Sequence, residues 1–312
     1  MKPAAMMEQK PLCAVIANPL RRCGVYRTAR QHAQALRCPL FTHGRIDYPA
    51  RVFYLHWHPN FAWQHPHFVQ ELSEFSAPVV IIAHDLLVAL PVPERCVLAI
   101  YAFDRRAHPN AKPLPMPLLD PYPHRPRQPD GDPDLVGMFG FFGLGKGAMT
   151  VLSYARQHKK RARFIMTLHP FAPPATEAAY SEFKALAKRW NMEVIDEWLE
   201  GQELADVMGE CGFFCVLHRF AGVGASGSVT SVLAAHRPIY GNPENPFLGA
   251  ARPAIMPFNK DRWPTERELR LAKQRVVEVA ASLAPEKLFA EVHAEVLSCL
   301  EATDVLSLST EK

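Results

Sequence analysis

Short runs of consecutive apolar residues recur along the chain, and most are followed by a segment with helical spacing. Val79–Ala83 (VVIIA) is typical, because it lacks the polar–apolar alternation of a strand with one face in water. Strands of this kind are buried on both faces, as in a parallel sheet covered by helices. The order of elements therefore predicts an α/β fold built from βαβ units. The expected strands are Leu12–Asn18, Val52–Leu55, Val79–Ala83, Val97–Ala102, Val136–Phe139, Phe164–Leu168, Glu193–Ile195 and Phe213–Leu217.

A proline-rich segment interrupts this pattern. Nine prolines lie between residues 108 and 133, too many for a helix, so a stiff, extended connection is expected there. Because 312 residues are about two domains long, we place the domain boundary in this segment. The predicted parts are an N-terminal Rossmann-like domain over 1–107, a linker over 108–133, a C-terminal Rossmann-like domain over 134–285, and a last helix over 286–312 that packs back on the first domain.

Cysteine usage and apolar run lengths exclude several classes of protein. The seven cysteines are odd in number and form no CxxC pair, which argues against a disulfide framework and a zinc ribbon. No apolar run approaches the ~18 residues of a membrane span, and the N-terminus lacks the apolar region of a signal peptide. A cytoplasmic protein is expected. A net charge of +4 permits contact with nucleic acid without indicating it.

The stretch from Phe213 to Tyr240 is the strongest candidate for chemistry. It reads as a buried strand, a loop of Gly, Ala and Ser over 221–228, and a helix over Val229–Ala235 that Pro238 closes. A strand, a small-residue loop and a helix N-terminus direct backbone N–H groups and the positive end of the helix dipole at one point. That point is expected to hold an anion, most plausibly a phosphate.

A second glycine-rich turn follows the strand at Val136. Residues Gly140 to Lys146 match the GxxxxGK pattern of a phosphate-binding loop, in which backbone amides and a lysine hold the phosphates. The next residue is Gly147 where such a loop has Ser or Thr, so the magnesium ligand is missing. A nucleotide triphosphatase is therefore a minor alternative.

The loop at 221–228 also contains a formal dinucleotide fingerprint, Gly222-x-Gly224-x-x-Gly227. It comes late in its domain instead of in the first βα unit, where that fingerprint belongs. Glu244, at the spacing of the ribose-binding acid, lies in a proline-rich loop and not at a strand end. A nicotinamide enzyme is therefore disfavoured.

The two turns have one prediction in common. Lys146 in the first, and Ser226, Ser228 and Thr230 in the second, can converge on a diphosphate above the carboxyl ends of the strands. The alternative is that the glycines serve tight turns and the lysine is solvated.

The whole chain resembles the GT-B glycosyltransferases, and most closely the retaining family 4 group. The resemblance implies an α/β GT-B fold, in which two Rossmann-like doubly wound domains face each other across a cleft, with the acceptor on the N-terminal domain and the nucleotide sugar on the C-terminal one. The matching stretches are Cys23-Gly24-Val25 before a helix, VVIIA followed by His84-Asp85, VGMFGFFGLGKG, ELADVMGECGFFCVL, and SGSVTSVLAAHRP before a strand.

The resemblance also assigns roles to residues. It implies a UDP- or GDP-sugar donor, no tightly bound cofactor and no metal. Lys146 and Arg219 are assigned to stabilise the leaving diphosphate. His84 or Asp85 is assigned to act near the acceptor hydroxyl. For Asp85 an equal alternative is to cap a helix at LLVAL. The remaining donor-binding candidates are Gly24, Phe141, Gly145, Gly147, His169, Gly224, Ser226, Gly227, Ser228 and Thr230.

Aromatic residues interleaved with histidines, LHWHPNFAWQHPH, form a separate candidate. Trp57, His58, Phe61 and Trp63 are predicted to bind the acceptor, with the aromatic rings stacking on a sugar or on an extruded base. Ordinary packing of these rings is an equal alternative. A metal site is a minor one, since no Cys or carboxylate is near.

The predicted function is sugar transfer, with retention, from a nucleotide-diphosphate sugar to a glycan or lipid-linked acceptor. A transferase acting on a hydroxymethylated base in DNA is the alternative enzyme. The third hypothesis is a non-catalytic GT-B protein that binds a nucleotide sugar or a partner. It is motivated by Val223 and Ser231, which occupy the positions where the family has its two acids.

Overall fold

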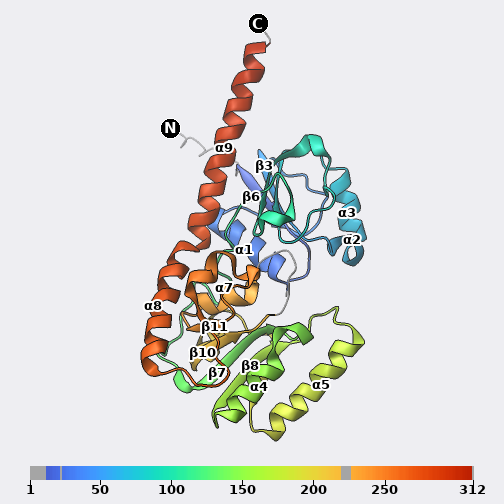
Figure 1. Cartoon of the computed structure of the whole chain (residues 1–312). Helices are drawn as coiled ribbons and strands as arrows, with labels where there is room; N and C mark the ends of the chain where they lie inside the picture. The colour runs from blue at the N-terminus through green and yellow to red at the C-terminus, as the bar shows by residue number, and fades with distance from the viewer. Residues whose placement is uncertain (1–11, 22, 219–225, 311–312) are drawn as a thin grey trace, which may run out of the picture. The chain divides into compact units, whose positions relative to one another are not determined.

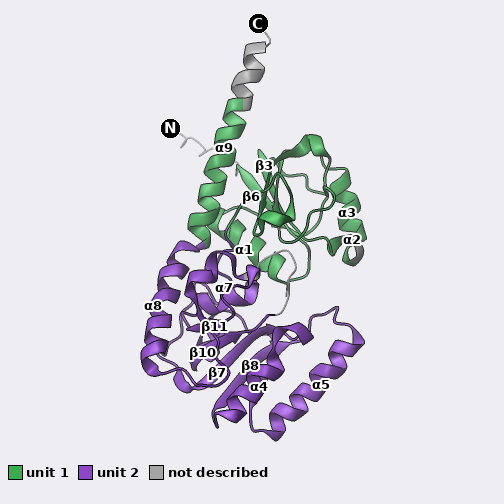
Figure 2. Cartoon of the chain, viewed as in Figure 1, with its two compact units in different colours: residues 1–114, 285–312 green, residues 115–284 purple. Residues whose placement is uncertain are grey.

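The computed structural model describes residues 12–21, 23–218 and 226–310. The chain forms two compact units, of which unit 1 is Met1–Leu114 with Pro285–Lys312 and unit 2 is Pro115–Ala284 (Figure 2). The proline-rich segment is thus divided: its first residues lie in unit 1, and those from Pro115 on lie in unit 2.

Unit 1 contains a six-stranded parallel sheet in the order β2-β1-β3-β4-β5-β6. The central strands β3 and β4 are buried along their whole length, because VFYLHW and VVIIA offer side chains that both faces can bury. The strands are β1 Cys13–Ile16, β2 Leu40–Phe41, β3 Val52–Trp57, β4 Val79–Ala83, β5 Val97–Ala102 and β6 Lys112–Pro113.

The helices of unit 1 come from both ends of the chain. The long C-terminal helix α9 (Pro285–Thr310) packs against α1 (Gly24–Leu36), although some 250 residues separate the two along the sequence (Figure 1). Its residue Phe289 is fully buried and stacks on His32 of α1, with ring centroids 3.9 Å apart. The remaining helices are α2 Phe61–Gln64, α3 Pro66–Ser73, and the short 3-10 turns η1 Glu94–Cys96 and η2 Arg105–Ala107.

Unit 2 contains a second six-stranded parallel sheet, in the order β12-β11-β10-β7-β8-β9. Counted from its own first strand, this is the 3-2-1-4-5-6 order of a dinucleotide-binding fold, read from the far edge. The strands are β7 Asp132–Phe141, β8 Arg161–Thr167, β9 Glu193–Ile195, β10 Cys211–Val216, β11 Ile239–Gly241 and β12 Ile255–Pro257.

The main core of unit 2 lies between the sheet and the helices α4 (Ala148–Gln157) and α5 (Pro174–Arg189), which run beside β8 in Figure 1. Val151 and Leu152 of α4 and Phe183 of α5 meet Phe164 of β8, and all four are buried. The other helices are α6 Gly201–Gly209, α7 Gly227–Ala234 and α8 Glu266–Ser282, with the 3-10 segments η3 Leu144–Lys146 and η4 Pro246–Ala254.

Two doubly wound units with fully parallel sheets confirm the predicted fold class. The predicted limits of three strands, namely Val79–Ala83, Val97–Ala102 and Glu193–Ile195, match the structure residue for residue. The strand predicted at Val136 is much longer, since β7 begins at Asp132.

Candidate functional site

The candidate site of unit 2 lies where its strand order reverses. β7 and β10 are neighbours in the sheet, and the chain leaves them toward opposite edges. The turns that follow these two strands therefore flank one crevice at the carboxyl end of the sheet, which is where doubly wound folds bind ligands.

Gly140, Lys146 and Ser228 come together at this edge. Gly140 lies near the end of β7, just before Phe141, and has φ +116°, a conformation that favours glycine. A methyl group on Gly140 would lie 2.3 Å from Ser228 Oγ and 3.6 Å from Lys146 Nζ. The turn after β7 and the start of α7 thus meet with no room for a side chain at residue 140.

Gly147 fixes the other side of the same turn. It has φ +83° and stands immediately before α4. A methyl group there would lie 2.7 Å from Leu217 Cβ, just beyond the end of β10. Gly140 and Gly147 therefore allow the turn η3, which carries Lys146, to lie against the end of β10. Gly145 lies inside that turn and is half-buried.

Lys146 is half-buried, and its positive charge acts on two neighbouring histidines. Burial lowers the pKa of its ammonium group to about 8. The pKa values of His169 and His218 are also lowered, first by burial and then by the positive charge of Lys146, to about 4 for His218. Among the ion pairs of the described residues, none involves Lys146. A bound anion would supply the missing counter-charge.

The start of α7 supplies further polar groups. Ser226 precedes the helix, is buried, and has Oγ 3.5 Å from His218 Nδ1. Asn245 holds His218 from the other side, since its Nδ2 donates to the His218 carbonyl at 2.7 Å. Thr230 is buried one turn into the helix and donates to the carbonyl of Gly227 at 3.2 Å, so its hydroxyl is engaged within the protein.

Aromatic rings line the neighbouring turn. Phe141 is half-buried; its ring meets the His169 ring at a centroid distance of 4.9 Å and stacks on Trp198 at 5.9 Å. Of the predicted donor-binding residues, Gly224 lies outside the described residues, as does the predicted catalytic Arg219.

Sequence reasoning missed His218, Asn245 and Trp198. Only His218 carried a signal, because it follows a buried strand directly at the predicted switch point. Asn245 and Trp198 come from connections whose course depends on the packing of the whole unit.

The predicted residues of unit 1 lie at the carboxyl edge of its own sheet. His84 and Asp85 follow β4 directly. Asp85 Oδ1 accepts from the Leu86 backbone N–H at 2.7 Å, and its Oδ2 lies 3.4 Å from His58 Nε2. Residues 86–93 are not helical, so the alternative of a helix cap at LLVAL is wrong. Gly24 begins α1, and a methyl group on it would meet no atom within 4 Å.

The aromatic acceptor surface needs correction. Trp57 and Phe61 are only 6% and 2% exposed, and their rings pack against each other edge to face at 5.4 Å. Both rings belong to the core, so neither presents a face for stacking on a sugar or a base. His58 is half-buried beside Asp85, and the side chain of Trp63 lies outside the described residues.

The described part of the chain lacks a metal cluster and a membrane-spanning helix. It contains no group of three or more His, Cys, Asp or Glu side chains arranged to hold a metal ion. None of its helices combines the length and the apolar character that crossing a membrane requires.

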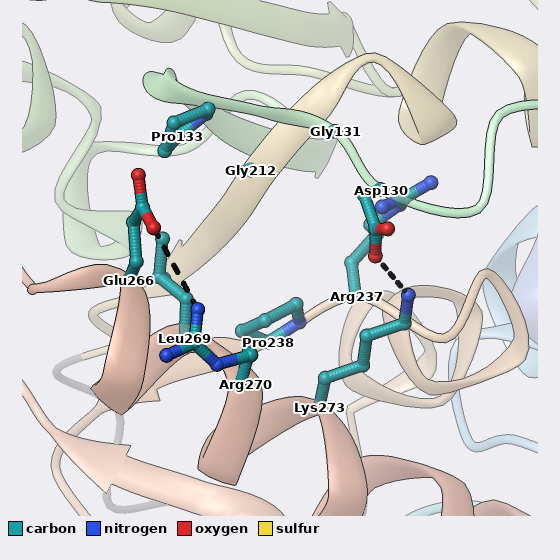
Figure 3. Close-up of a pocket in the computed structure, with 10 residues that line it drawn as sticks. All are labelled: Asp130, Gly131, Pro133, Gly212, Arg237, Pro238, Glu266, Leu269, Arg270 and Lys273. Carbon is teal, nitrogen blue, oxygen red and sulfur yellow. Dashed lines mark hydrogen bonds and ion pairs between the residues drawn. The ribbon is translucent and has the colours of Figure 1, made fainter.

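A pocket of about 300 Å³ opens at the opposite, amino edge of the unit 2 sheet (Figure 3). Its charged side chains are largely paired: Lys273 with Asp130 at 2.6 Å, and Arg270 with Glu266 at 3.6 Å. The buried Arg237 donates to the carbonyls of Gln128 and Pro129. This pocket is lined by the starts of β7 and β10 and is separate from the residues around Lys146.

Comparisons with known proteins support the fold. No family model and no curated protein matches the sequence. AviGT4, a glycosyltransferase involved in avilamycin A biosynthesis, is 18% identical with a TM-score of 0.61, over 94% of this chain and 99% of AviGT4. HepE of Anabaena, solved with UDP and glucose, is 10% identical with a TM-score of 0.63, over 92% and 99%.

An alpha-glucosyltransferase solved with UDP and a DNA 13-mer containing a central A:G mismatch is also similar. It is 11% identical with a TM-score of 0.61, over 93% of this chain and all of that one. At such identities the likeness concerns the fold. The chain is therefore structurally similar to GT-B glycosyltransferases, and its two Rossmann-like units are of the kind found in that fold.

Proposed function

We propose that this protein is a glycosyltransferase that moves a sugar from a nucleotide-diphosphate sugar to an acceptor hydroxyl. One observation carries the proposal: the Lys146 ammonium group lies beside Gly140 and Ser228 at the switch point of unit 2. A cation held there without an ion-pair partner among the described residues fits a ligand that brings two negative charges, as a diphosphate does.

The chemistry required of the site is charge stabilisation. When the bond between the sugar and the diphosphate breaks, negative charge grows on the leaving oxygen, and fixed donors aimed at that oxygen lower the barrier. Lys146 supplies a positive charge and Ser228 a hydroxyl, both at the start of α7 and its helix dipole. Residues at the edge of unit 1, His84 and Asp85, are proposed to act near the acceptor hydroxyl.

For the acceptor we favour a glycan or a lipid-linked precursor, with transfer that retains the anomeric configuration. A hydroxymethylated base in DNA is the second candidate, supported by the net charge of +4 and by the fold it shares with an alpha-glucosyltransferase solved on DNA. That candidate loses its other support, because Trp57 and Phe61 are buried and cannot stack on an extruded base.

A protein that binds the donor without transferring the sugar is the third candidate. Ser231, at the position of the family's second acid, is fully buried, and its Oγ has no hydrogen-bond partner among the described residues. Val223, at the position of the first, lies outside the described residues. Under the first proposal, by contrast, transfer relies on Lys146 and the backbone of α7 in place of the acids.

Calorimetry with a panel of UDP- and GDP-sugars tests the donor site. We expect one nucleotide class to bind and Lys146→Met to weaken its binding by at least ~tenfold, since a charge-assisted contact is worth about 1.5–3 kcal/mol. Lys160→Met is the matched control, because that lysine pairs with Asp134 in the same unit. Absence of binding by every nucleotide sugar, or unchanged binding by Lys146→Met, would refute the proposal.

A second measurement separates catalysis from binding. We expect slow hydrolysis of the bound donor in the absence of acceptor, followed by nuclear magnetic resonance of the released sugar, and transfer when a glycan acceptor is added. Binding with neither reaction favours the non-catalytic protein. A shift of duplex DNA bearing hydroxymethylated bases, weakening linearly with the logarithm of the salt concentration, would favour the DNA acceptor.

A further inference from the structure

Three histidines form a continuous hydrogen-bonded chain through the core of unit 1. His32 of α1 has Nδ1 2.9 Å from Nε2 of His56 on β3, and His56 Nδ1 lies 3.0 Å from Nε2 of His84, just after β4. The chain therefore runs from a helix, across the sheet, to the carboxyl edge. None of the sequence motifs predicted it.

Burial favours the neutral form of all three imidazoles. His32 and His56 are fully buried. Burial lowers the pKa of each of the three rings well below the ordinary range of histidine, and the neighbouring histidines add to the effect for His56 and His84. A neutral imidazole has one N–H donor and one unprotonated acceptor nitrogen.

When all three rings are neutral, the hydrogen bonds of the histidine chain can run in only two directions. Each of its two hydrogen bonds needs one N–H and one bare nitrogen, so the middle ring of His56 must donate through one nitrogen and accept through the other. Either all three rings carry the proton on Nδ1, or all three carry it on Nε2. The tautomer of His84 is thus coupled to that of His32, two hydrogen bonds away.

The buried end of the chain selects between the two polarities. Within the described part of the chain His32 Nε2 has no hydrogen-bond partner, and its ring stacks on Phe289 at 3.9 Å, with the ring planes 7° apart. If the rings carried their protons on Nε2, the Nε2–H group of His32 would be buried without an acceptor. Buried N–H groups without a partner are rarer in proteins than buried acceptors without a donor. The arrangement with all protons on Nδ1 leaves only a lone pair there.

We propose that His56 and His32 are positioning residues that hold His84 as its Nδ1–H tautomer, so that His84 offers substrate a hydrogen-bond donor at the sheet edge. His84 Nε2 is occupied by the N–H of His56 and cannot take a proton without breaking the chain. His84 is thus a donor to a substrate oxygen and not the base that removes the acceptor's proton. The part played by substrate rests on the proposed function; the tautomer does not.

Long-range nitrogen–proton correlation spectra of the full chain, labelled with 15N-histidine, test the tautomer directly. We expect the three coupled rings to show a protonated Nδ1 and a bare Nε2. Assignment comes from the loss of one ring in each of the variants His32→Leu, His56→Leu and His84→Leu. Protonated Nε2 in the three rings, or a mixture at His84, would overturn the proposal whatever the variants do.

Variants at residue 56 test the coupling. His56→Leu removes the donor to His84 and should turn its single tautomer into a mixture. His56→Gln should restore the Nδ1–H form, because its side-chain amide can donate to the same nitrogen. His293→Phe is the matched control: His293 Nδ1 bonds to the Tyr54 hydroxyl at 2.7 Å in the same unit but lies outside the chain. An unchanged His84 tautomer in His56→Leu would contradict the inference.

An activity measurement links the tautomer to substrate. With an identified donor and acceptor, His56→Leu should lower kcat/KM about tenfold, the effect of one lost hydrogen bond, while His56→Gln and His293→Phe stay near wild type. If no nucleotide sugar binds, the proposed function fails and the nitrogen spectra still decide the tautomer. If transfer occurs but the spectra show Nε2–H rings, the positioning role fails alone.

Discussion

Gly140 and Ser228 are in closer contact than any residue with a side chain at position 140 would allow. A methyl group on residue 140 would lie 2.3 Å from Ser228 Oγ, and the φ angle of +116° is itself unfavourable for other residues. We expect Gly140→Ala to lower the free energy of unfolding by ~2–4 kcal/mol and to abolish donor binding, because Ser228 and Lys146 must move apart. Urea denaturation and calorimetry measure the two effects.

A double-mutant cycle isolates the contact. Gly140→Ala combined with Ser228→Gly should recover part of the lost stability, because the clash is removed while the unfavourable φ angle remains. Gly143→Ala is the matched control, since a methyl group there would meet only Lys146 Cγ, at 3.8 Å. Equal costs for Gly140→Ala and Gly143→Ala would show that the contact with Ser228 does not matter.

The low pKa of Lys146 predicts how donor binding depends on pH. Its ammonium group has a pKa of about 8 in the unbound protein, so the cation needed for a diphosphate is lost as the pH rises through 8. We expect affinity for a nucleotide sugar to be constant between pH 6 and 7.5 and to fall by up to ~tenfold per unit above pH 8. His218, with a pKa of about 4, stays neutral over this range.

Calorimetry between pH 6 and 10 measures this dependence. Lys146→Arg should abolish the decline, since a guanidinium group keeps its charge throughout the range. A wild-type affinity that remains constant up to pH 10 would mean that another group supplies the positive charge.

The buried cation also makes a prediction for stability. The pKa of Lys146 falls from 10.5 to about 8 on folding, so the unfolded chain binds more protons between these pH values. This group therefore costs stability below pH 8, and the free energy of unfolding rises as the pH increases from 8 to 10.5. At about 1.4 kcal/mol per pKa unit, discounted for the side chain's partial exposure, Lys146→Met should stabilise the protein by ~2 kcal/mol at pH 7.

Thermal and urea denaturation of Lys146→Met at pH 7 and pH 10 check the sign. The gain should shrink at pH 10, where the wild-type lysine is already largely neutral. Lys160→Met, whose lysine is ion-paired at the surface, should change stability by less than ~1 kcal/mol. Destabilisation by Lys146→Met at pH 7 would show that the lysine is held by favourable contacts.

Much of the fold could be predicted because its strands are unambiguous. β4 and β5 are continuous apolar runs, and β4 is bounded by Pro78 and His84, so both strands could be predicted from the pattern alone. β2, β6 and β12 were missed, because β2 and β6 have only two residues and β6 and β12 each include a proline. Such short edge strands exist only through pairing with a neighbour already in place.

The candidate site was predictable in its backbone and less so in its side chains. Glycines at positive φ and a lysine after a strand are local signals, and Gly140, Gly147 and Lys146 were found from them. Burial depends on distant packing: nothing local says that Trp57 faces the core or that His56 meets two other histidines. Those contacts join elements far apart in the sequence.

The burial of Phe61 leads to a prediction that separates packing from acceptor recognition. Its ring is 2% exposed and lies edge to face with Trp57 at 5.4 Å and Phe68 at 6.3 Å. We expect Phe61→Ala to lower the free energy of unfolding by ~3–5 kcal/mol, the usual cost of a cavity left by a buried aromatic ring. Leu271→Ala, at a position 47% exposed, should change it by less than ~1 kcal/mol. The Phe61→Ala protein that does fold should keep the wild-type KM for acceptor. A large rise in that KM without loss of stability would instead show that Phe61 contacts the acceptor.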